Sequence, residues 1–171
     1  MKNCTTQLPI IEFITSNIEC DRAFEFGMNL FTTNLLSDRF KNVISVESDQ
    51  NWYDEMKKEQ LPDHVDLQIS LEKKSAIDIL NSVNGKLSCV IVDGNEDNRW
   101  ECVNASFEKT DVIIAHDTET HSYKWNLIEK PKDFLWIDIK QYNPWTSVLT
   151  TNKDLILAIV QKYPSHTVNH V

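Results

Sequence analysis

Acidic side chains stand at or directly after the ends of most short apolar runs in the first two thirds of the chain. The runs end in Glu25-Phe26-Gly27, Val46-Glu47-Ser48-Asp49, Ile69-Ser70, Val92-Asp93-Gly94 and Ala115-His116-Asp117. In an open α/β sheet, ligands bind beyond the carboxyl ends of the strands. If the runs are parallel strands, these carboxylates meet at one edge of the sheet, where they can hold hydroxyl groups, a cation or a proton. This edge is the predicted functional site.

Glu47 is the carboxylate whose position suggests a role most clearly. It ends the second apolar run, about 20 residues after Gly27, which is where an acidic residue accepts hydrogen bonds from the ribose hydroxyls of an adenosine cofactor. A carboxylate there favours a free ribose over a 2′-phosphate and so disfavours NADP. The alternative is an acidic residue that caps the next helix or is simply solvated.

The loop after the first run, Gly27-Met28-Asn29-Leu30, contains one glycine. Dinucleotide binding needs G-x-G-x-x-G, because the second glycine lets the backbone approach a pyrophosphate. The loop therefore disfavours a phosphate-bearing cofactor. A cofactor without phosphate, such as S-adenosylmethionine, needs one close backbone segment and a carboxylate near its amine, and Gly27 and Glu25 could supply these.

Asp93 and Asp117 are predicted to end neighbouring strands, which would bring their carboxylates together. They could bind a divalent cation, or they could orient substrate and handle a proton with His116 or His121 as general base. Helix capping by the aspartates and a buried, hydrogen-bonded His116 are the structural alternatives. A transition-metal site is disfavoured, because no third imidazole or thiolate follows at helical spacing.

These residues need a sheet and helices to position them. Short apolar runs predict five strands, and the stretches between them are long enough for helices with one polar side. The strands are 23–26, 43–46, 65–69, 89–92 and 112–115, and the helices are 29–39, 50–59, 73–84 and 97–109, after a leading helix within 1–20. The alternation predicts a doubly wound α/β fold, Rossmann-like, with a mostly parallel sheet and helices on both faces.

The last third of the chain has a different pattern. Residues 134–139 and 155–160 are predicted as two strands, joined as an antiparallel pair through residues 142–152. Residues 164–171 are predicted to be a flexible tail. Residues 1–163 would then form one domain.

Composition limits the kinds of partner. The chain has 171 residues, a net charge of −9 and 41% hydrophobic residues, as expected for one globular domain. The negative field disfavours nucleic acid and anionic membranes. The four cysteines have no C-x-x-C spacing, and no secretory signal or membrane-spanning run is evident, so a cytoplasmic protein is expected.

Taken in order, four motifs at the run ends and a fifth near the end of the chain resemble class I S-adenosylmethionine-dependent methyltransferases, in a branch whose substrate is unassigned. The similarity covers about residues 21–160. The matching residues are Glu25-Phe26-Gly27 with Thr32-Thr33, Glu47-Ser48-Asp49 with Trp52, Asp93-Gly94 with Arg99, His116-Asp117-Thr118-Glu119 with Tyr123, and Pro144-Trp145-Thr146-Ser147-Val148-Leu149-Thr150-Thr151-Asn152.

The resemblance implies seven strands, the last antiparallel, and S-adenosylmethionine as cofactor. It implies a cofactor-binding set of Glu25, Gly27, Asn29, Thr32, Glu47, Ser48, Ser70 and Asp93. It places the catalytic and acceptor-binding groups at Asp93, Arg99, His116, Asp117, Tyr123 and Trp145, with Asp93 and Asp117 as ligands if a divalent cation binds. The expected activity is methylation of a small or medium polar acceptor.

Asn29 is the main departure from the family pattern, because it occupies the position of the second loop glycine. Either its backbone is left-handed, which asparagine tolerates, or the cofactor lies differently. Two alternative functions therefore remain. The chain could be an inactive methyltransferase fold that serves as a binding or scaffold protein, or an enzyme that breaks down S-adenosylmethionine itself.

Overall fold

The computed structural model describes residues 6–94 and 98–170. The start of the predicted leading segment, the first residue of the predicted helix 97–109 and the last residue of the predicted tail lie outside these ranges. Within the described residues, no helix combines the length and the apolar character needed to cross a bilayer.

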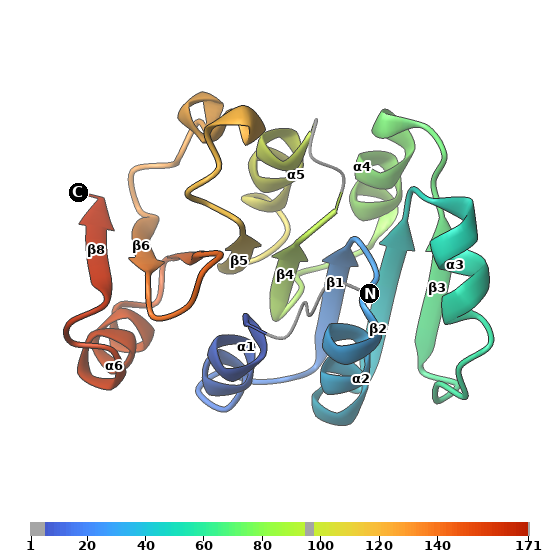
Figure 1. The fold of residues 1–171 in the computed structure, drawn as a ribbon, viewed down its shortest axis with the longest axis horizontal. Helices are drawn as coiled ribbons and strands as arrows, with labels where there is room; N and C mark the ends of the chain where they lie inside the picture. The colour runs from blue at the N-terminus through green and yellow to red at the C-terminus, as the bar shows by residue number, and fades with distance from the viewer. Residues whose placement is uncertain (1–5, 95–97, 171) are drawn as a thin grey trace.

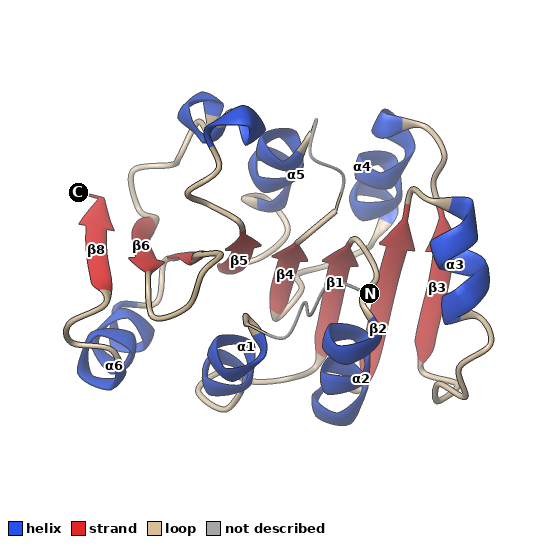
Figure 2. Ribbon diagram, viewed as in Figure 1, coloured by secondary structure: helices blue, strands red, loops and turns tan. Residues whose placement is uncertain are grey.

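One eight-stranded sheet runs through the molecule in the order β3-β2-β1-β4-β5-β7-β6-β8 (Figures 1 and 2). The strands are β1 (Arg22–Phe26), β2 (Asn42–Glu47), β3 (Val65–Ile69), β4 (Cys89–Val92), β5 (Val112–His116), β6 (Leu135–Ile139), β7 (Thr146–Thr150) and β8 (Thr167–His170). β1 to β5 are parallel, whereas β7 is antiparallel to β5 and β6, and β8 is antiparallel to β6. The carboxyl ends of β1 to β5 therefore share one edge, as predicted.

Helices cover both faces of this sheet (Figure 1). α1 (Leu8–Thr15), α2 (Leu30–Arg39) and α6 (Lys153–Lys162) lie on one face, and α4 (Lys73–Ser82) and α5 (Arg99–Ser106) lie on the other. α3 (Gln50–Met56) packs against β2 and β3. Two short 3-10 helices, η1 (His121–Tyr123) and η2 (Trp125–Leu127), follow β5, and η2 contacts α5.

Strand alternation divides the apolar side chains between two cores. In β1, Phe24 and Phe26 join the core beneath α4 and α5, whereas Ala23 joins the core beneath α1, α2 and α6. In β4 all residues are buried, because helices cover both faces. The predicted α/β fold with five parallel strands is confirmed.

The last third of the chain differs from the prediction. Residues 155–160 lie in α6, not in a strand, and the second strand of the predicted pair is β7, within residues assigned to the connection. Asn152 caps α6 by accepting a hydrogen bond from the Leu155 backbone N–H at 3.0 Å. Ile156 and Ile159 are buried one helical turn apart, while Leu157 is 59% exposed. A short apolar run cannot separate a buried helix from a strand, and here the cap and the one-sided burial form a helix.

The sheet also has eight strands where seven were predicted. The additional strand, β8, lies within the predicted tail and pairs with β6, from Trp136 opposite His170 to Ile139 opposite Thr167. β8 can form because β6 would otherwise present unpaired backbone groups at the edge of the sheet. The register of this pairing is not visible in the sequence, because it depends on where α6 returns the chain.

Candidate functional site

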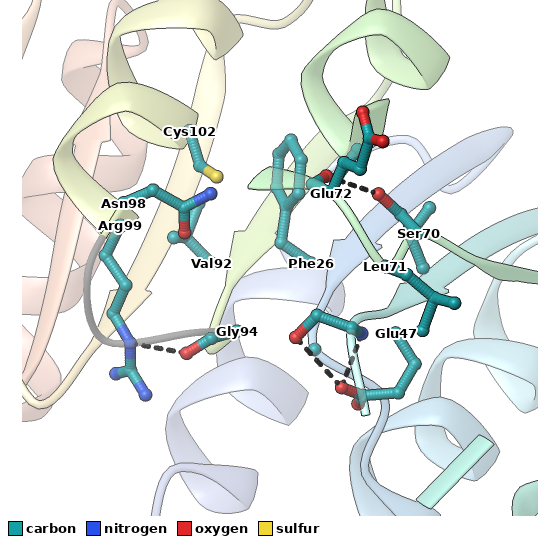
Figure 3. Close-up of a pocket in the computed structure, with 14 residues that line it drawn as sticks. Phe26, Glu47, Ser70, Leu71, Glu72, Val92, Gly94, Asn98, Arg99 and Cys102 are labelled. Atoms are coloured by element: carbon teal, nitrogen blue, oxygen red, sulfur yellow. Dashed lines mark hydrogen bonds between the residues drawn. The ribbon is translucent and has the colours of Figure 1, made fainter. Parts of the chain in front are cut away.

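A central cleft opens at the carboxyl ends of β1 to β4, between α4 and α5 (Figure 3). The space between its walls is about 540 Å³, which includes volume open to solvent. It is lined by Phe26, Gly27, Val46, Glu47, Ser48, Ser70, Leu71, Glu72, Ala76, Val92, Gly94, Asn98, Arg99 and Cys102. The lining thus combines an apolar pocket with a few polar groups, and it includes four of the predicted cofactor-binding residues: Gly27, Glu47, Ser48 and Ser70.

Glu47 is held in place by backbone groups around it. Its Oε1 accepts hydrogen bonds from the backbone N–H groups of Ser48 and Asp49 at 2.6 and 2.9 Å, and its Oε2 accepts one from Met28 at 3.1 Å. Burial raises the pKa of Glu47, and these hydrogen bonds oppose the increase. The result is a fixed, 8% exposed carboxylate at the edge of the cleft.

Gly27 is required by its backbone conformation and by its neighbour Gly94. Its φ is +86°, and a Cβ added there would lie 2.5 Å from the Gly94 Cα and 2.6 Å from the Asp93 carbonyl oxygen. No real Cβ approaches backbone atoms so closely, so the loops after β1 and β4 can touch only through a glycine. This contact forms the floor of the central cleft.

Asn29 adopts the extended conformation, with φ −141° and ψ 127°, and caps α2. Its Oδ1 accepts the backbone N–H groups of Phe31 and Thr32 at 3.0 and 3.4 Å, and the Thr33 N–H donates to the Asn29 carbonyl oxygen. The left-handed alternative is therefore wrong. Because the N–H groups of Phe31, Thr32 and Thr33 are already bonded, these three donors are not available to hold a phosphate, in agreement with the sequence.

Glu25 lies inside the protein and does not line the central cleft. It is 0% exposed, and its Oε2 accepts hydrogen bonds from Ser45 Oγ at 2.5 Å and Thr33 Oγ1 at 2.7 Å. Burial is the largest cause that raises its pKa, to about 8. Phe24 and Phe26 point to the cleft side of β1 and Glu25 points to the opposite side, so its carboxylate, predicted to lie beside the amine of a cofactor, does not face the central cleft.

Thr32 is also buried, beneath a residue that the sequence did not single out. Gln7, just before α1, donates from Nε2 to Asp93 Oδ2 at 2.7 Å and to Thr32 Oγ1 at 3.4 Å. Gln7 is 0% exposed, and among the described residues its Oε1 has no hydrogen-bond partner. Neither Asn29 nor Thr32 lines the central cleft. The cleft is thus lined by residues predicted to bind the adenosine part of the cofactor, such as Glu47 and Ser70. Thr32, which was predicted to bind the methionine part, lies under Gln7.

Asp93, His116 and Asp117 form an ionic cluster around the Arg99 guanidinium. Arg99 donates from Nε to the Gly94 carbonyl oxygen, from Nη1 to the His116 carbonyl oxygen and Asp117 Oδ2, and from Nη2 to the Asp93 carbonyl oxygen, at 2.9 to 3.3 Å. Nη2 also lies 3.3 Å from Asp93 Oδ1. Four of the five N–H groups of the guanidinium donate hydrogen bonds in this way, so Arg99 organises the cluster at the ends of β4 and β5 while it also lines the central cleft.

His116 carries a proton within this cluster at neutral pH. Its Nδ1 lies 3.1 Å from Asp117 Oδ1 and 3.4 Å from Asp93 Oδ1. Burial alone would lower the pKa of His116, but hydrogen bonds and charges of the two aspartates raise it to about 9. Burial would raise the pKa of Asp117, but the partnership with His116, and then Arg99, holds it below its ordinary value.

The same cluster was the predicted metal site. Ligand atoms of Asp93, His116 and Asp117 all lie within 4.8 Å of one another, as a metal ion would require. However, the positive charges between the two carboxylates belong to the Arg99 guanidinium and the His116 imidazolium. A divalent cation would have to compete with the Arg99 guanidinium for both carboxylates, and His116 would have to lose its proton to become a ligand, so the residues as placed do not fit a resident metal ion.

Comparisons with known proteins agree with this topology. No known protein-family model matches the sequence, and no curated protein matches it. Among solved structures, the chain is similar to an O-methyltransferase from Bacillus cereus in complex with SAH, with a TM-score of 0.68 and 13% identity, over 89% of this chain and 82% of that one. An O-methyltransferase of tomaymycin synthesis from Streptomyces achromogenes, in complex with SAM, has a TM-score of 0.66 and 11% identity, over 84% and 80%. An rRNA methylase from Streptococcus thermophilus has a TM-score of 0.57 and 11% identity, over 84% and 95%.

The chain has the class I methyltransferase fold. In this methyltransferase fold the central cleft lies where strand order reverses, beside β1 and β4. Trp52, predicted from the second motif, supports this region by donating from Nε1 to the Met28 carbonyl oxygen at 2.5 Å. Asn98, Leu71 and Cys102 also line the cleft but had not been predicted, because their types carry no signal outside the tertiary structure.

The predicted acceptor-binding residues Tyr123 and Trp145 lie on the far side of the ionic cluster from Glu47. Tyr123 is 8% exposed, and its ring lies 4.5 Å from the Arg99 guanidinium carbon. Trp145 lines a second cavity, which we call the tryptophan cleft. It is lined by Thr118, Glu119, His121, Trp125, Asn126, Ile128, Trp136, Asp138 and Trp145. Within this methyltransferase fold, Tyr123 therefore supports the cluster, and Trp145 faces open space.

Proposed function

We propose that the protein is an S-adenosylmethionine-dependent methyltransferase that acts on a small or medium polar acceptor. The observation that carries this proposal is the position of Glu47: a fixed carboxylate at the end of β2, facing a cleft of about 540 Å³ in a class I methyltransferase fold. A carboxylate in that position suits the two hydroxyls of a ribose. The bonded N–H groups of α2 argue against a cofactor with a pyrophosphate.

The chain offers suitable contacts for adenosine. Phe26, Val46 and Val92 provide apolar surface for a base, and Ser70 provides a hydroxyl at the end of β3. Gly27 and Gly94 let the loops after β1 and β4 pack directly against each other at the edge of the cleft. S-Adenosylmethionine, when bound, supplies a methyl group on a sulfonium, which is already a good leaving group. The contribution of the protein is then to align the acceptor, which requires little covalent chemistry.

The ionic cluster has a positioning role in this proposal. Arg99 joins the ends of β4 and β5 through backbone and carboxylate oxygens, so it fixes the wall between the central cleft and the tryptophan cleft. With a pKa of about 9, His116 does not accept a proton at neutral pH. The acceptor is therefore expected to be a group that reacts without strong base assistance.

Calorimetric titration with S-adenosylmethionine and with S-adenosylhomocysteine tests the proposal. Glu47→Gln keeps an oxygen for the backbone N–H groups but removes the charge, and it is expected to weaken binding at least about tenfold, since a hydrogen bond to a charged group contributes roughly 1.5–3 kcal/mol. Glu55→Gln, an exposed substitution on α3, serves as the matched control. Absence of binding by the wild-type protein, or equal binding by Glu47→Gln and the control, would refute the proposal.

The class of acceptor is supported mainly by charge. The fold is shared with an rRNA methylase as well as with an O-methyltransferase of tomaymycin synthesis. A net charge of −9 repels a phosphate backbone and supports a small acceptor over a nucleic acid. Filter binding with structured RNA at low salt checks this choice, with no retention expected.

A second candidate is a protein that binds the cofactor without transferring its methyl group. The ionic cluster favours this alternative, because its two carboxylates are paired and its imidazole is protonated. Formation of S-adenosylhomocysteine with any member of a panel of polar acceptors would exclude it. Turnover in the absence of acceptor would instead indicate breakdown of S-adenosylmethionine itself.

A further inference from the structure

The residues just before α1 lie against the ionic cluster and the first turn of α2. Gln7 donates from Nε2 to Asp93 Oδ2 at 2.7 Å and to Thr32 Oγ1 at 3.4 Å. Thr6 Oγ1 lies 3.4 Å from His116 Nε2. We call residues 6 and 7 the plug, because together they cover two members of the cluster.

Asp93 connects the plug to the central cleft. A Cβ on Gly27 would lie 2.6 Å from the Asp93 carbonyl oxygen, and Asp93 Oδ1 lies 3.3 Å from Arg99 Nη2. Gly27 and Arg99 both line the central cleft, whereas the plug residues do not. Figure 3 shows Arg99 and Glu47 on opposite sides of Gly94. The plug therefore adjoins the end of the cleft that is remote from Glu47.

The side-chain amide of Gln7 is only half satisfied in this position. Gln7 is 0% exposed, and among the described residues its Oε1 accepts no hydrogen bond. A buried oxygen without a donor is destabilising, because in water it would be bonded. An ammonium group has three donors and no acceptor, so in the same place it would bond to Asp93 and Thr32 and leave no oxygen unpaired.

The Gln7 side chain can leave this position while α1 stays in place. The Gln7 carbonyl oxygen accepts the backbone N–H groups of Ile10 and Ile11 at 3.0 Å, so the Gln7 backbone belongs to the start of the helix. Ile10, Ile11 and Ile14 are 0% exposed and fix α1 to the core. Release of the amide therefore needs rotation of one side chain, which is a fast motion, and no unfolding of the helix.

We propose that the plug closes the amino-acid end of the cofactor site in the free protein, and that Gln7 yields Asp93 and Thr32 to the ammonium group of S-adenosylmethionine when the cofactor binds. The inference rests on the proposed function. A charge-assisted bond from an ammonium to Asp93 is stronger than the bond from the neutral Gln7 amide, so the exchange is favourable. A nucleoside that lacks the amino acid leaves the plug closed.

Calorimetric titration with S-adenosylmethionine and with 5′-methylthioadenosine, which lacks the amino-acid part, tests this inference. Gln7→Ala is expected to bind S-adenosylmethionine about fivefold or more tightly than the wild-type protein, because a closed plug no longer reduces the population that can bind. Its affinity for 5′-methylthioadenosine should stay within about twofold. Gln161→Ala, the same substitution at an exposed position of α6, is the matched control.

Thermal unfolding establishes that each variant is folded. Unchanged or weaker S-adenosylmethionine binding by folded Gln7→Ala would overturn the inference, as would equal changes for the two ligands, which indicate a merely structural role. Binding of 5′-methylthioadenosine that Glu47→Gln weakens supports the proposed function even if the prediction for Gln7 fails. Absence of binding of either ligand by the wild-type protein would refute both.

A second measurement uses the wild-type protein alone. The side-chain amide protons of Gln7 are followed by nuclear magnetic resonance as they exchange with solvent. S-Adenosylhomocysteine, which retains the amino acid, should speed this exchange at least about tenfold, because it breaks the bond to Asp93, and 5′-methylthioadenosine should leave the rate unchanged. Acceleration by both ligands, or by neither, would overturn the inference.

Discussion

Replacing Gly27 with alanine is the most informative single perturbation of the central cleft. The added Cβ would lie 2.5 Å from the Gly94 Cα and 2.6 Å from both the Gly94 nitrogen and the Asp93 carbonyl oxygen. Because these are backbone atoms, the loops after β1 and β4 must separate, at a cost of about 1–3 kcal/mol. The left-handed backbone, with φ +86°, adds about 1–2 kcal/mol. The expected destabilisation is therefore about 2–5 kcal/mol, a large part of the roughly 5–15 kcal/mol of a typical domain.

Gly85→Ala is a matched control for this prediction. Gly85 also has a left-handed backbone, with φ +77°, but a Cβ there would meet only Arg22 Nη1, at an ordinary 3.7 Å. It should therefore lose only the conformational part, about 1–2 kcal/mol. Denaturant unfolding measures both free energies, and calorimetry measures S-adenosylmethionine binding, which Gly27→Ala alone should weaken. Equal destabilisation of the two variants, or undiminished binding by Gly27→Ala, would refute the proposed contact between the two loops.

Three further predictions concern other parts of the site. Glu25 has a pKa raised from 4.5 to about 8, so between these values the folded state keeps a proton that the unfolded state has lost. The free energy of unfolding should thus fall by roughly 1.4 kcal/mol per pH unit over that interval and level off above it, and Glu25→Gln should flatten this slope in denaturant unfolding at several pH values. Trp52→Phe removes the donor to the Met28 carbonyl oxygen and should lower stability by about 0.5–1.5 kcal/mol and weaken S-adenosylmethionine binding in calorimetry; an unchanged affinity would show that this hydrogen bond does not support the cleft. EDTA should change neither the thermal midpoint nor cofactor affinity, because Arg99 neutralises the carboxylates; a loss restored by Mg²⁺ would contradict this.

The sequence predicted the five parallel strands and the edge where their ends meet, because continuous apolar runs are a direct consequence of burial on both faces. It failed in the last third, where residues 155–160 form α6. An apolar run of that length fits a buried strand as well as one face of a helix. The choice was made by the Asn152 cap and by contacts of the helix with β6 and β7.

Within the site, residue type and spacing identified Gly27 and Glu47 as residues of the cleft, but not the backbone contacts that each of them makes. The sequence placed Glu25 near a cofactor, and the structure buries it beside Ser45 and Thr33. The reason is strand alternation: Phe26 faces the central cleft, so its neighbour Glu25 faces the other core. Gln7 carried no sequence signal, because its contact with Asp93 joins residues far apart in the chain.

The sequence by itself determined which groups reach the carboxyl edge of the sheet, since each follows the end of an apolar run. Only the tertiary structure decided which of them face open space. Arg99 and His116 became internal counter-charges because β4 and β5 are adjacent and bring Asp93 and Asp117 together around them. Glu47 lines the central cleft because β2 pairs with β1. Trp136 and Trp145 line the tryptophan cleft because β7 pairs with β6. Charge balance in a buried cluster depends on distances between segments, and those distances arise only when the sheet is assembled.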